Sequence, residues 1–279
     1  MKISSFFVRV ACALGCLGLA AAGARGQGVW NYSGPIYSFG SRAFARDGAS
    51  PNGGVVVSPD GKTLYGTTYS GGKSNLGTVF AFHLDNNGQP SGPPITRWDF
   101  GNGFFNGAHP QGNLVLANGI LYGTTLYGGS FGKGSVYRIG ADGLNPPYSS
   151  LWYFSSEPIP QIPGHPYDGN LPSYAGLTLS SDGTILHGTT MFGGDNDKGA
   201  VFAIGGAAHY QLLHQFTVGF PDDGSFPQAA LVLSADGQKL YGTTSAGSNN
   251  DNGTVFAVST IGDVNGTYTV LDPHVSLLG

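Results

Sequence analysis

The stretch that decides the fold is residues 65–80, which read YGTTYSGGKSNLGTVF. The pattern returns three more times, and in every copy a second glycine stands eleven residues after the glycine of the first four letters. Those first glycines are Gly66, Gly123, Gly188 and Gly242, so the period is 54 to 65 residues. Self-similarity at a period of about 50 residues is typical of repeat architectures such as propellers.

Each repeat is predicted to hold four antiparallel strands, lettered a to d in chain order. Strand a is a short apolar run such as residues 55–57, and an Asp-Gly or Asn-Gly pair joins it to strand b, the Leu-Tyr-Gly-Thr-Thr segment. Such pairs between apolar runs are the strongest short-range hairpin signal. Strand c begins at Gly-Thr-Val-Phe, and strand d ends in an aromatic residue. The hairpin pairs are Asp60-Gly61, Asn118-Gly119, Asp182-Gly183 and Asp236-Gly237.

Repeated four-stranded units of this size are the sequence form of propeller blades. We therefore predict an all-β fold, a β-propeller of about four four-stranded antiparallel blades. The number of strands does not match four complete blades. Strands a, b and c each occur four times, whereas strand d occurs five times if residues 36–39 and 268–271 are included. A closed ring, a partial fifth blade and an open fan that pairs with a second chain stay open. The predicted repeat cores lie near residues 47–100, 106–154, 168–216 and 223–271.

The composition agrees with a chain rich in strands and tight turns. Glycine takes 48 of the 279 positions, Glu157 is the only glutamate, and charged residues make up 10% of the chain. Long helices favour Glu, Lys, Ala and Leu, so a helical bundle is excluded. Aromatic residues make up 12%, which argues against disorder. The formal net charge of −4 offers no basic surface for phosphates, and nucleic-acid binding is not expected.

The beginning of the chain has the pattern of a signal peptide. Two basic residues, Lys2 and Arg9, precede an apolar run at residues 10–22. This run is shorter than the ~20 residues that a membrane-spanning helix needs. Small residues then predict cleavage after Ala24. An alternative, lipoprotein processing, would use Cys16.

This pattern sets the expected domain organisation and location. We expect the mature protein to be secreted, periplasmic or on the cell surface, with no membrane span. The division is a signal peptide over residues 1–24, a lead-in over 25–35 and a single β-propeller domain over 36–279.

The repeat of residues 65–80 resembles the GloVer tandem repeat, a family of exported bacterial proteins that vary in how they are anchored. The resemblance covers residues 36–271, which is nearly all of the chain after the signal peptide. Departures include His187 in place of tyrosine and Ala200 in place of threonine. The resemblance implies a surface or secreted location and a propeller-like fold. It implies no known activity, catalytic residue, cofactor or ligand.

Candidate binding residues gather at one end of the predicted blades. Alternating strand direction puts the d–a loops, the b–c loops and the Thr-Thr ends of strand b on one side, here named the loop face. The d–a loops carry Asp47, Asn106, Asp168 and Asp223, each followed by Gly-x-x-Pro. These side chains either ring a ligand pocket or brace the loops by accepting hydrogen bonds from amides and hydroxyls. Because the residue recurs in every blade, the pattern favours bracing.

Side chains that differ between blades are more informative about a binding site. The b–c loops carry Tyr69, Tyr127 and Phe192, whereas the fourth copy has Ser245 and Ala246. Exposed aromatic rings at these positions would stack on sugar rings or on side chains of a partner, although packing between blades is their commoner use.

One b–c loop has a faint likeness to a calcium loop. Asp195 and Asp197 place a carboxylate at every second position, as the oxygen ligands of a calcium-binding loop are spaced. However, no bidentate glutamate follows them, and the equivalent loops of the other repeats lack the pattern. We therefore predict no metal site and no cofactor, with these two aspartates as the weak exception.

The sequence holds no recognisable catalytic motif. It lacks Gly-x-Ser-x-Gly, His-Glu-x-x-His, a phosphate loop and a dinucleotide fingerprint. Paired carboxyls for glycoside hydrolysis are limited to Asp222 with Asp223, and Asp168 is accompanied only by His165.

Three functional hypotheses follow. The favoured one is an exported, non-catalytic propeller that binds a glycan or an extracellular protein on its loop face. The second is a polysaccharide hydrolase or lyase with an Asp-based site on the same face. The third is a structural protein of the cell envelope or matrix. The ligand, any catalysis and the oligomeric state stay open.

Overall fold

The computed structural model describes residues 35–39, 47–101, 106–155, 168–172, 176–205, 208–217, 223–247, 252–261 and 268–271. The chain divides into two compact units, Met1–Ile36 and Tyr37–Gly279, and the fold below is that of the second. Residues 1–24, predicted as a signal peptide, lie outside the described ranges, as does the lead-in except for Pro35. Those ranges contain no helix, and therefore none that could cross a membrane.

The described residues form four separate antiparallel sheets, which confirms the predicted all-β fold of four blades. Blade 1 holds β1 (Val56–Val57), β2 (Thr63–Thr68), β3 (Thr78–His83) and β4 (Ile95–Asp99). Blade 2 holds β5 (Gly107–Pro110), β6 (Val115–Ala117), β7 (Ile120–Gly128), β8 (Ser135–Gly140) and β9 (Ser149–Tyr153). Blade 3 holds β10 (Gly169–Pro172), β11 (Thr178–Leu179), β12 (Ile185–Gly193), β13 (Ala200–Gly205) and β14 (Ala208–Gln215). Blade 4 holds β15 (Gly224–Pro227), β16 (Val232–Leu233), β17 (Lys239–Gly247), β18 (Thr254–Ser259) and β19 (Thr269–Val270).

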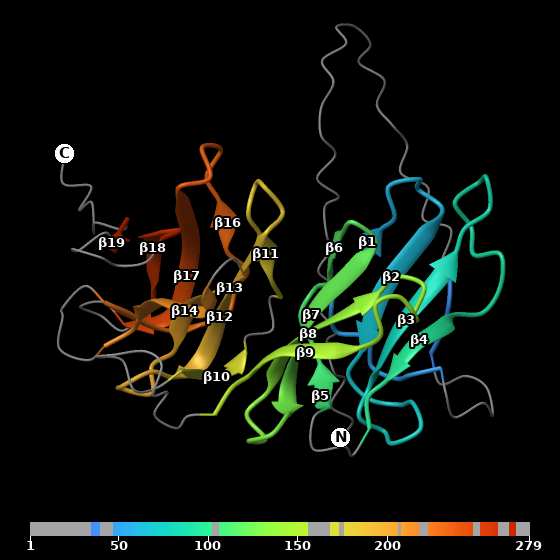
Figure 1. Cartoon of the computed structure of the whole chain (residues 1–279), viewed down its shortest axis with the longest axis horizontal. Coiled ribbons are helices and arrows are strands. Elements are labelled where there is room, and N and C mark those ends of the chain that lie inside the picture. Colours follow the sequence, from blue (N-terminus) through green and yellow to red (C-terminus); the bar gives the residue numbers. More distant parts are fainter. Residues whose placement is uncertain are drawn as a thin grey trace, which may run out of the picture. The chain divides into compact units, whose positions relative to one another are not determined.

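The blades follow one another in chain order, with blade 1 on the right of Figure 1 and blade 4 on the left. Within each blade, neighbouring strands pair in the predicted order a, b, c, d. The hairpin prediction is confirmed in detail for blade 2. Asn118 and Gly119 have φ values of 49° and 73°, as a type I′ turn requires of its two central residues.

The inner strand is longer than the sequence predicted. The Gly-x-x-Pro segments, assigned to d–a loops, form β5, β10 and β15 and pair with the far halves of β7, β12 and β17. In blade 1 the same segment makes a single bridge, between Ala49 and Ser70. This additional pairing extends strand b beyond the Thr-Thr pair. The prediction of strand ends at Thr-Thr is therefore wrong for blades 2 to 4.

The repeated glycine of strand b makes room for an aromatic ring of strand c. Gly66 pairs with Phe80, and a Cβ on the glycine would stand 2.5 Å from the ring carbon Cζ. Gly188 is placed in the same way against Phe202, at 2.6 Å from Cζ. The close approach of the ring explains why the glycine recurs in every copy, since any side chain would displace the aromatic residue.

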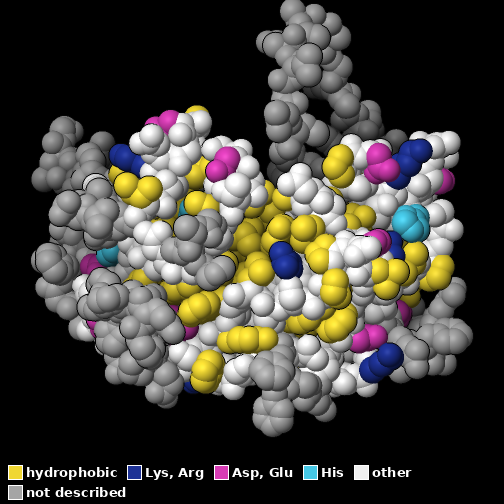
Figure 2. All heavy atoms as spheres, in the orientation of Figure 1, with side chains coloured by type: hydrophobic (Ala, Val, Ile, Leu, Met, Phe, Trp, Pro, Cys, Tyr) yellow, Lys and Arg dark blue, Asp and Glu magenta, His cyan; other side chains and the backbone are white. Residues whose placement is uncertain are grey.

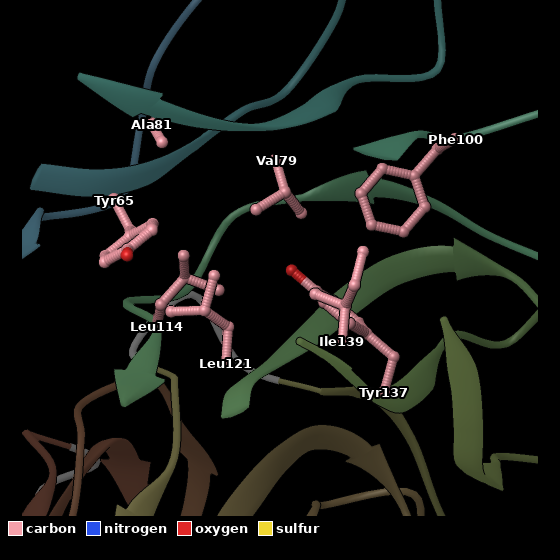
Figure 3. Packing of buried hydrophobic residues seen from close by; sticks show 8 residues of the cluster. All are labelled: Tyr65, Val79, Ala81, Phe100, Leu114, Leu121, Tyr137 and Ile139. Carbon is pink, nitrogen blue, oxygen red and sulfur yellow. The ribbon is translucent and has the colours of Figure 1, made fainter. Parts of the chain in front are cut away.

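Buried clusters join each blade to the next. Between blades 1 and 2, Tyr65, Val79 and Ala81 face Leu121 and other residues of blade 2 (Figure 3). Two further clusters join blade 2 to blade 3 and blade 3 to blade 4. Among the described residues no such cluster joins blade 4 to blade 1. Within the described residues, buried clusters thus join the four blades only as neighbours in chain order, and this series of blades is here named the fan.

An aromatic residue at the end of strand d in blades 1 to 3 completes these clusters. The fully buried Phe100, Phe154 and Phe216 each pack edge-on against an aromatic ring of the following blade, at 5.2–5.3 Å between ring centroids. Residues 36–39, counted in the sequence as a further strand d, form no strand in the structure. Phe39 nevertheless packs on Phe80 of blade 1 at 5.0 Å.

Candidate functional site

Asp168 is fully buried at the start of the inner strand of blade 3. One carboxylate oxygen, Oδ2, accepts a hydrogen bond from the indole Nε1 of Trp152 at 3.1 Å. The backbone N–H and the hydroxyl of Ser155 also donate to this carboxylate, at 3.1–3.2 Å. Asp168 thus connects the end of strand d in blade 2 to blade 3.

Asp223 makes the same connection between blades 3 and 4. The backbone N–H of Thr217 donates to its Oδ2 at 2.7 Å, and the hydroxyl of Thr217 donates at 2.9 Å. His214 Nε2 lies 3.4 Å from Oδ1. Burial raises the pKa of Asp223, but the hydrogen bonds from His214 and Thr217 outweigh that effect and hold the pKa below its ordinary value.

The remaining two members of the set differ from this pattern. Asp47 is half-buried and accepts a hydrogen bond from the Tyr37 hydroxyl at 2.7 Å. Asn106 accepts one from Gly129 N–H at 2.9 Å through its main-chain carbonyl. At Asp47, Asp168 and Asp223 the donors come from the segment that precedes the blade, and this arrangement is consistent with bracing.

A group of aromatic side chains lies on the loop face at the junction of blades 1 and 2. We name Tyr69, His109 and Tyr127 the aromatic cluster. The rings of Tyr69 and His109 stack, with centroids 4.4 Å apart and an interplanar angle of 29°. Tyr127 meets His109 edge-on at 6.0 Å and is 42% exposed, whereas the other two are half-buried. The cluster presents a preformed aromatic surface to solvent.

His109 was missed by the sequence reasoning, and the backbone explains its position. It is the second variable residue of the Gly-x-x-Pro segment and has a φ of 57°. Its N–H donates to the Leu76 carbonyl of blade 1 at 2.8 Å, and its Nδ1 lies 2.9 Å from the Tyr69 carbonyl. These bonds hold the ring between the blades. The signal in the sequence was the variation at this position, which is occupied by Ser50, His109, Leu171 and Phe226.

Phe192 occupies the corresponding place between blades 3 and 4. Its ring centroid lies 5.4 Å from that of Phe226, and both rings are half-buried. The Lys198 ammonium stands 4.7 Å from the centroid of Phe226, within the range of a cation–π interaction. The structure thus brings Tyr69 and Tyr127 into one cluster, because the ring of His109 contacts both of them. The ring of Phe192 contacts Phe226 instead.

Asp195 and Asp197 both accept hydrogen bonds from residues of blade 3. Asp195 Oδ2 accepts a hydrogen bond from Gln215 Nε2 at 2.9 Å, and Asp197 Oδ1 accepts one from Gly193 N–H at 2.8 Å. Nowhere in the described ranges do three or more His, Cys, Asp or Glu side chains gather as they would around a metal ion. Of the residues considered for acid pairs, Asp222 and His165 lie outside those ranges.

A small pocket of about 190 Å³ lies at the hairpin end, opposite the loop face, between blades 2 and 3. Its lining is mainly apolar, with Leu151, Leu179 and Leu186 among the side chains. Arg138 also lines it and donates a hydrogen bond through Nε to the Ser149 hydroxyl at 3.0 Å. The sequence reasoning did not find this pocket, since it is formed by residues far apart in the chain.

Charged side chains are few on the face that Figure 2 shows, and they are scattered among hydrophobic ones. Over that face no large area of one sign is visible, in keeping with a composition that offers little for a nucleic acid.

Comparison with known proteins places the repeat in a family. The model of the Gloeobacter/Verrucomicrobia repeat matches residues 23–164, which is half of the chain. None of the curated proteins is recognisably similar in sequence.

Several solved structures share part of the architecture at low identity. A protein described as TolB from Agrobacterium tumefaciens has 15% identity and a TM-score of 0.45, over 81% of this chain and 61% of that one. The periplasmic gluconolactonase PpgL of Pseudomonas aeruginosa has 20% identity and a TM-score of 0.44, over 80% and 56%. A puromycin-hydrolyzing peptidase of Mycobacterium tuberculosis has 14% identity and a TM-score of 0.45, over 83% of this chain and 30% of that one. This chain thus spans less than two thirds of each of these proteins, and the activities in their names belong to them.

Proposed function

Because this chain belongs to the Gloeobacter/Verrucomicrobia repeat family, we propose that it is an exported, non-catalytic binding module built from four propeller blades. Its ligand, in this proposal, is a glycan that binds to the aromatic cluster of the loop face. The observation that carries the proposal is the stacked pair of Tyr69 and His109 beside the exposed ring of Tyr127.

The chemistry of the cluster favours a sugar ring as its ligand. The C–H faces of a pyranose are apolar and pack against the faces of aromatic rings, while its hydroxyls stay in water. The cluster is already ordered by the contacts between His109 and blade 1, so little side-chain entropy is lost on binding. The buried aspartates support a binding role over a hydrolytic one, because their oxygens are occupied by donors of the protein itself.

A glycan array followed by calorimetry tests the proposal. We expect Tyr127→Ala and Tyr69→Ala each to weaken the binding of the selected glycan by about tenfold, the equivalent of ~1.4 kcal/mol and close to the value of one aromatic contact. Leu144→Ala, which truncates an exposed apolar residue of blade 2 away from the cluster, is the matched control and should bind normally.

Three results would contradict the proposal. Loss of binding in Tyr122→Ala, with normal binding in Tyr127→Ala, would place the ligand in the pocket at the hairpin end. Release of reducing sugar from the bound glycan would show that the protein is an enzyme. A protein ligand in place of a glycan would be revealed by an empty array together with binding to an extracellular protein that Tyr127→Ala abolishes.

A further inference from the structure

The two ends of the blade series expose residues that the internal junctions bury. On strand c, the second residue is a valine in every blade, and it packs toward the following blade. This valine is fully buried in blades 1 to 3, but Val255 of blade 4 is 44% exposed. The buried counterparts are Val79, Val136 and Val201.

Blade 1 has the complementary exposure on strand a. Val55 is 58% exposed, whereas its counterparts in blades 2 to 4, which pack toward the preceding blade, are 4–6% exposed. The proline at the end of the Gly-x-x-Pro segment shows the same difference between blade 1 and the other blades. Pro51 is exposed, and the equivalent prolines are buried. The counterparts are Leu114, Leu177 and Leu231 for Val55, and Pro110, Pro172 and Pro227 for Pro51.

Each internal junction also has a hydrogen bond between backbones. Leu171 N–H of blade 3 donates to the Lys133 carbonyl of blade 2 at 3.0 Å, and the equivalent bonds at the other two junctions measure 2.8 Å. Ser50 of blade 1 keeps the same left-handed conformation, with a φ of 55°. Its natural acceptor is the carbonyl of Asn252 in blade 4, yet these two described residues are not bonded to each other. The Ser50 N–H in blade 1 and the Asn252 carbonyl in blade 4 thus lie at opposite ends of the blade series, and they correspond to the donor and the acceptor of an internal junction.

Phe39 supplies the last part of a junction. At internal junctions the ring that packs against strand c comes from the end of strand d in the preceding blade, as Phe100 packs against Tyr137. Phe39 packs against Phe80 of strand c in blade 1 at 5.0 Å between ring centroids, although the described residues before blade 1 form no strand. In the described residues β19 spans two residues, whereas β4, β9 and β14 span five to eight. Within residues 268–271 the strand d of blade 4 is thus short, and blade 1 holds a segment that would extend it.

We propose that blade 4 of one copy docks against blade 1 of a second copy, and that two copies close head to tail into one ring of eight blades. The contact repeats the internal junctions. Val255 of one copy is covered by blade 1 of the other, and Ser50 N–H donates to the Asn252 carbonyl across the contact. Residues 37–39 then lie beside β18 of the neighbouring copy. Eight blades are within the known range of propellers, and a head-to-tail contact that closes gives a finite assembly.

A second copy is a better occupant than the same chain's own opposite end. The three internal junctions are packed around buried aromatic and aliphatic clusters, and with these junctions in place the two end faces stay exposed. Closing four blades on themselves would change the angle at all three, and close-packed interiors resist such changes. Docking of a second copy leaves every internal junction as it is.

Sedimentation velocity of the purified chain is the first test, and the expected mass is twice the mass of that chain measured under denaturing conditions. Val255→Asp and Val55→Asp each introduce a charge on an exposed residue at one end of the fan, so the fold should tolerate both. Each should raise the dimer dissociation constant at least 100-fold, because the charge would be buried on docking. Leu144→Asp, on a more exposed residue of blade 2, is the matched control and should remain dimeric.

Mixing the two variants separates a head-to-tail contact from other dimers. In a mixed pair, one junction carries both charges and the other carries none, so two-chain species should reappear. A dimer that forms normally with Val255→Asp, or failure of the mixture to associate, would overturn the proposal. A monomeric wild-type chain, or open polymers that lengthen with concentration, would overturn it as well.

A disulfide distinguishes two copies from one chain closed on itself. Ser50→Cys combined with Asn252→Cys should, on oxidation, give a covalent two-chain product. A cross-link that leaves the mass of a single chain would show that the four blades close on themselves, and the proposal would be wrong.

Discussion

Each blade carries two Asp-Gly or Asn-Gly pairs, one at each end, and the two ends use the pair differently. At the hairpin end, Asp182 is exposed, and its hydrogen bonds from Ser180 and Thr184 are local; these lower its pKa. A Cβ added to Gly183 would meet no atom within 4 Å. At the loop face, Asp168 is buried and its donors come from blade 2.

The glycines of the two pairs are also required for different reasons, one local and one from a neighbouring strand. Gly183 is required by its conformation, with a φ of 74° in the hairpin turn. Gly169 is required by its neighbour, since a Cβ there would overlap the Thr190 hydroxyl. The same dipeptide thus makes a local turn at one end and a contact between strands at the other. Substitutions at the loop-face end should therefore affect the whole blade, and those at the hairpin end only the turn.

The largest effect is expected for Gly169→Ala. The added methyl group collides with Thr190 in a fully buried position, and overpacking of this kind costs about 3 kcal/mol of unfolding free energy. Gly183→Ala, with space around it, should cost about 1 kcal/mol for the left-handed conformation alone. Urea unfolding of both variants measures the difference, and equal losses would contradict the comparison.

Removing a loop-face carboxylate should have an intermediate effect. Asp223→Ala leaves the two half-buried donors of Thr217 without their acceptor, so we expect a loss of about 1–3 kcal/mol and a lower melting temperature before any change in binding. Asp182→Ala, at an exposed hairpin, should lower the melting temperature less. If Asp223→Ala melted like the wild type and lost ligand binding, the carboxylate would be part of the binding site instead.

The pH dependence of stability sharpens the same comparison. The pKa of Asp223 is lower in the folded protein than in the unfolded chain, so its contribution is fully present above the unfolded value of about 3.9. The contribution is lost as the pH falls through the lower, folded value. Thermal melts between pH 5 and 2 should therefore bring the wild type and Asp223→Ala closer together at the acidic end.

The smallest effect should be a gain in stability. The second threonine of the repeat bonds to the residue opposite it on strand c, as Thr125 does with Ser135 at 2.9 Å. In blade 3 that residue is Ala200, and within the described ranges the buried Thr190 hydroxyl has no partner. Ala200→Ser should raise the unfolding free energy by about 1 kcal/mol by supplying one. A melting temperature at or below that of the wild type would refute this.

The blade architecture could be predicted because its signals are local. Asn118-Gly119 favours a two-residue hairpin through the conformation of its own backbone, and the Leu-Tyr-Gly-Thr-Thr and Gly-Thr-Val-Phe segments that mark strands b and c are short contiguous stretches of sequence. The candidate site was only partly predictable. Tyr69 and Tyr127 were visible as variable aromatic residues, but His109, which joins them, is forty residues from Tyr69. Its position depends on a backbone bond between two blades, and no local pattern encodes such a bond.

The sequence by itself determined the number of repeats, the order of strands within each and the positions of the hairpins, since these depend on residues close together in the chain. Only the tertiary structure decided that the Gly-x-x-Pro segments are strands and that Asp168 and Asp223 are buried between blades. It also decided that Val55 and Val255, at the two ends of the blade series, are exposed. The physical reason is that these features depend on the packing of one blade against another. All four repeats carry nearly the same residues, so their sequence cannot distinguish a covered face from an uncovered one.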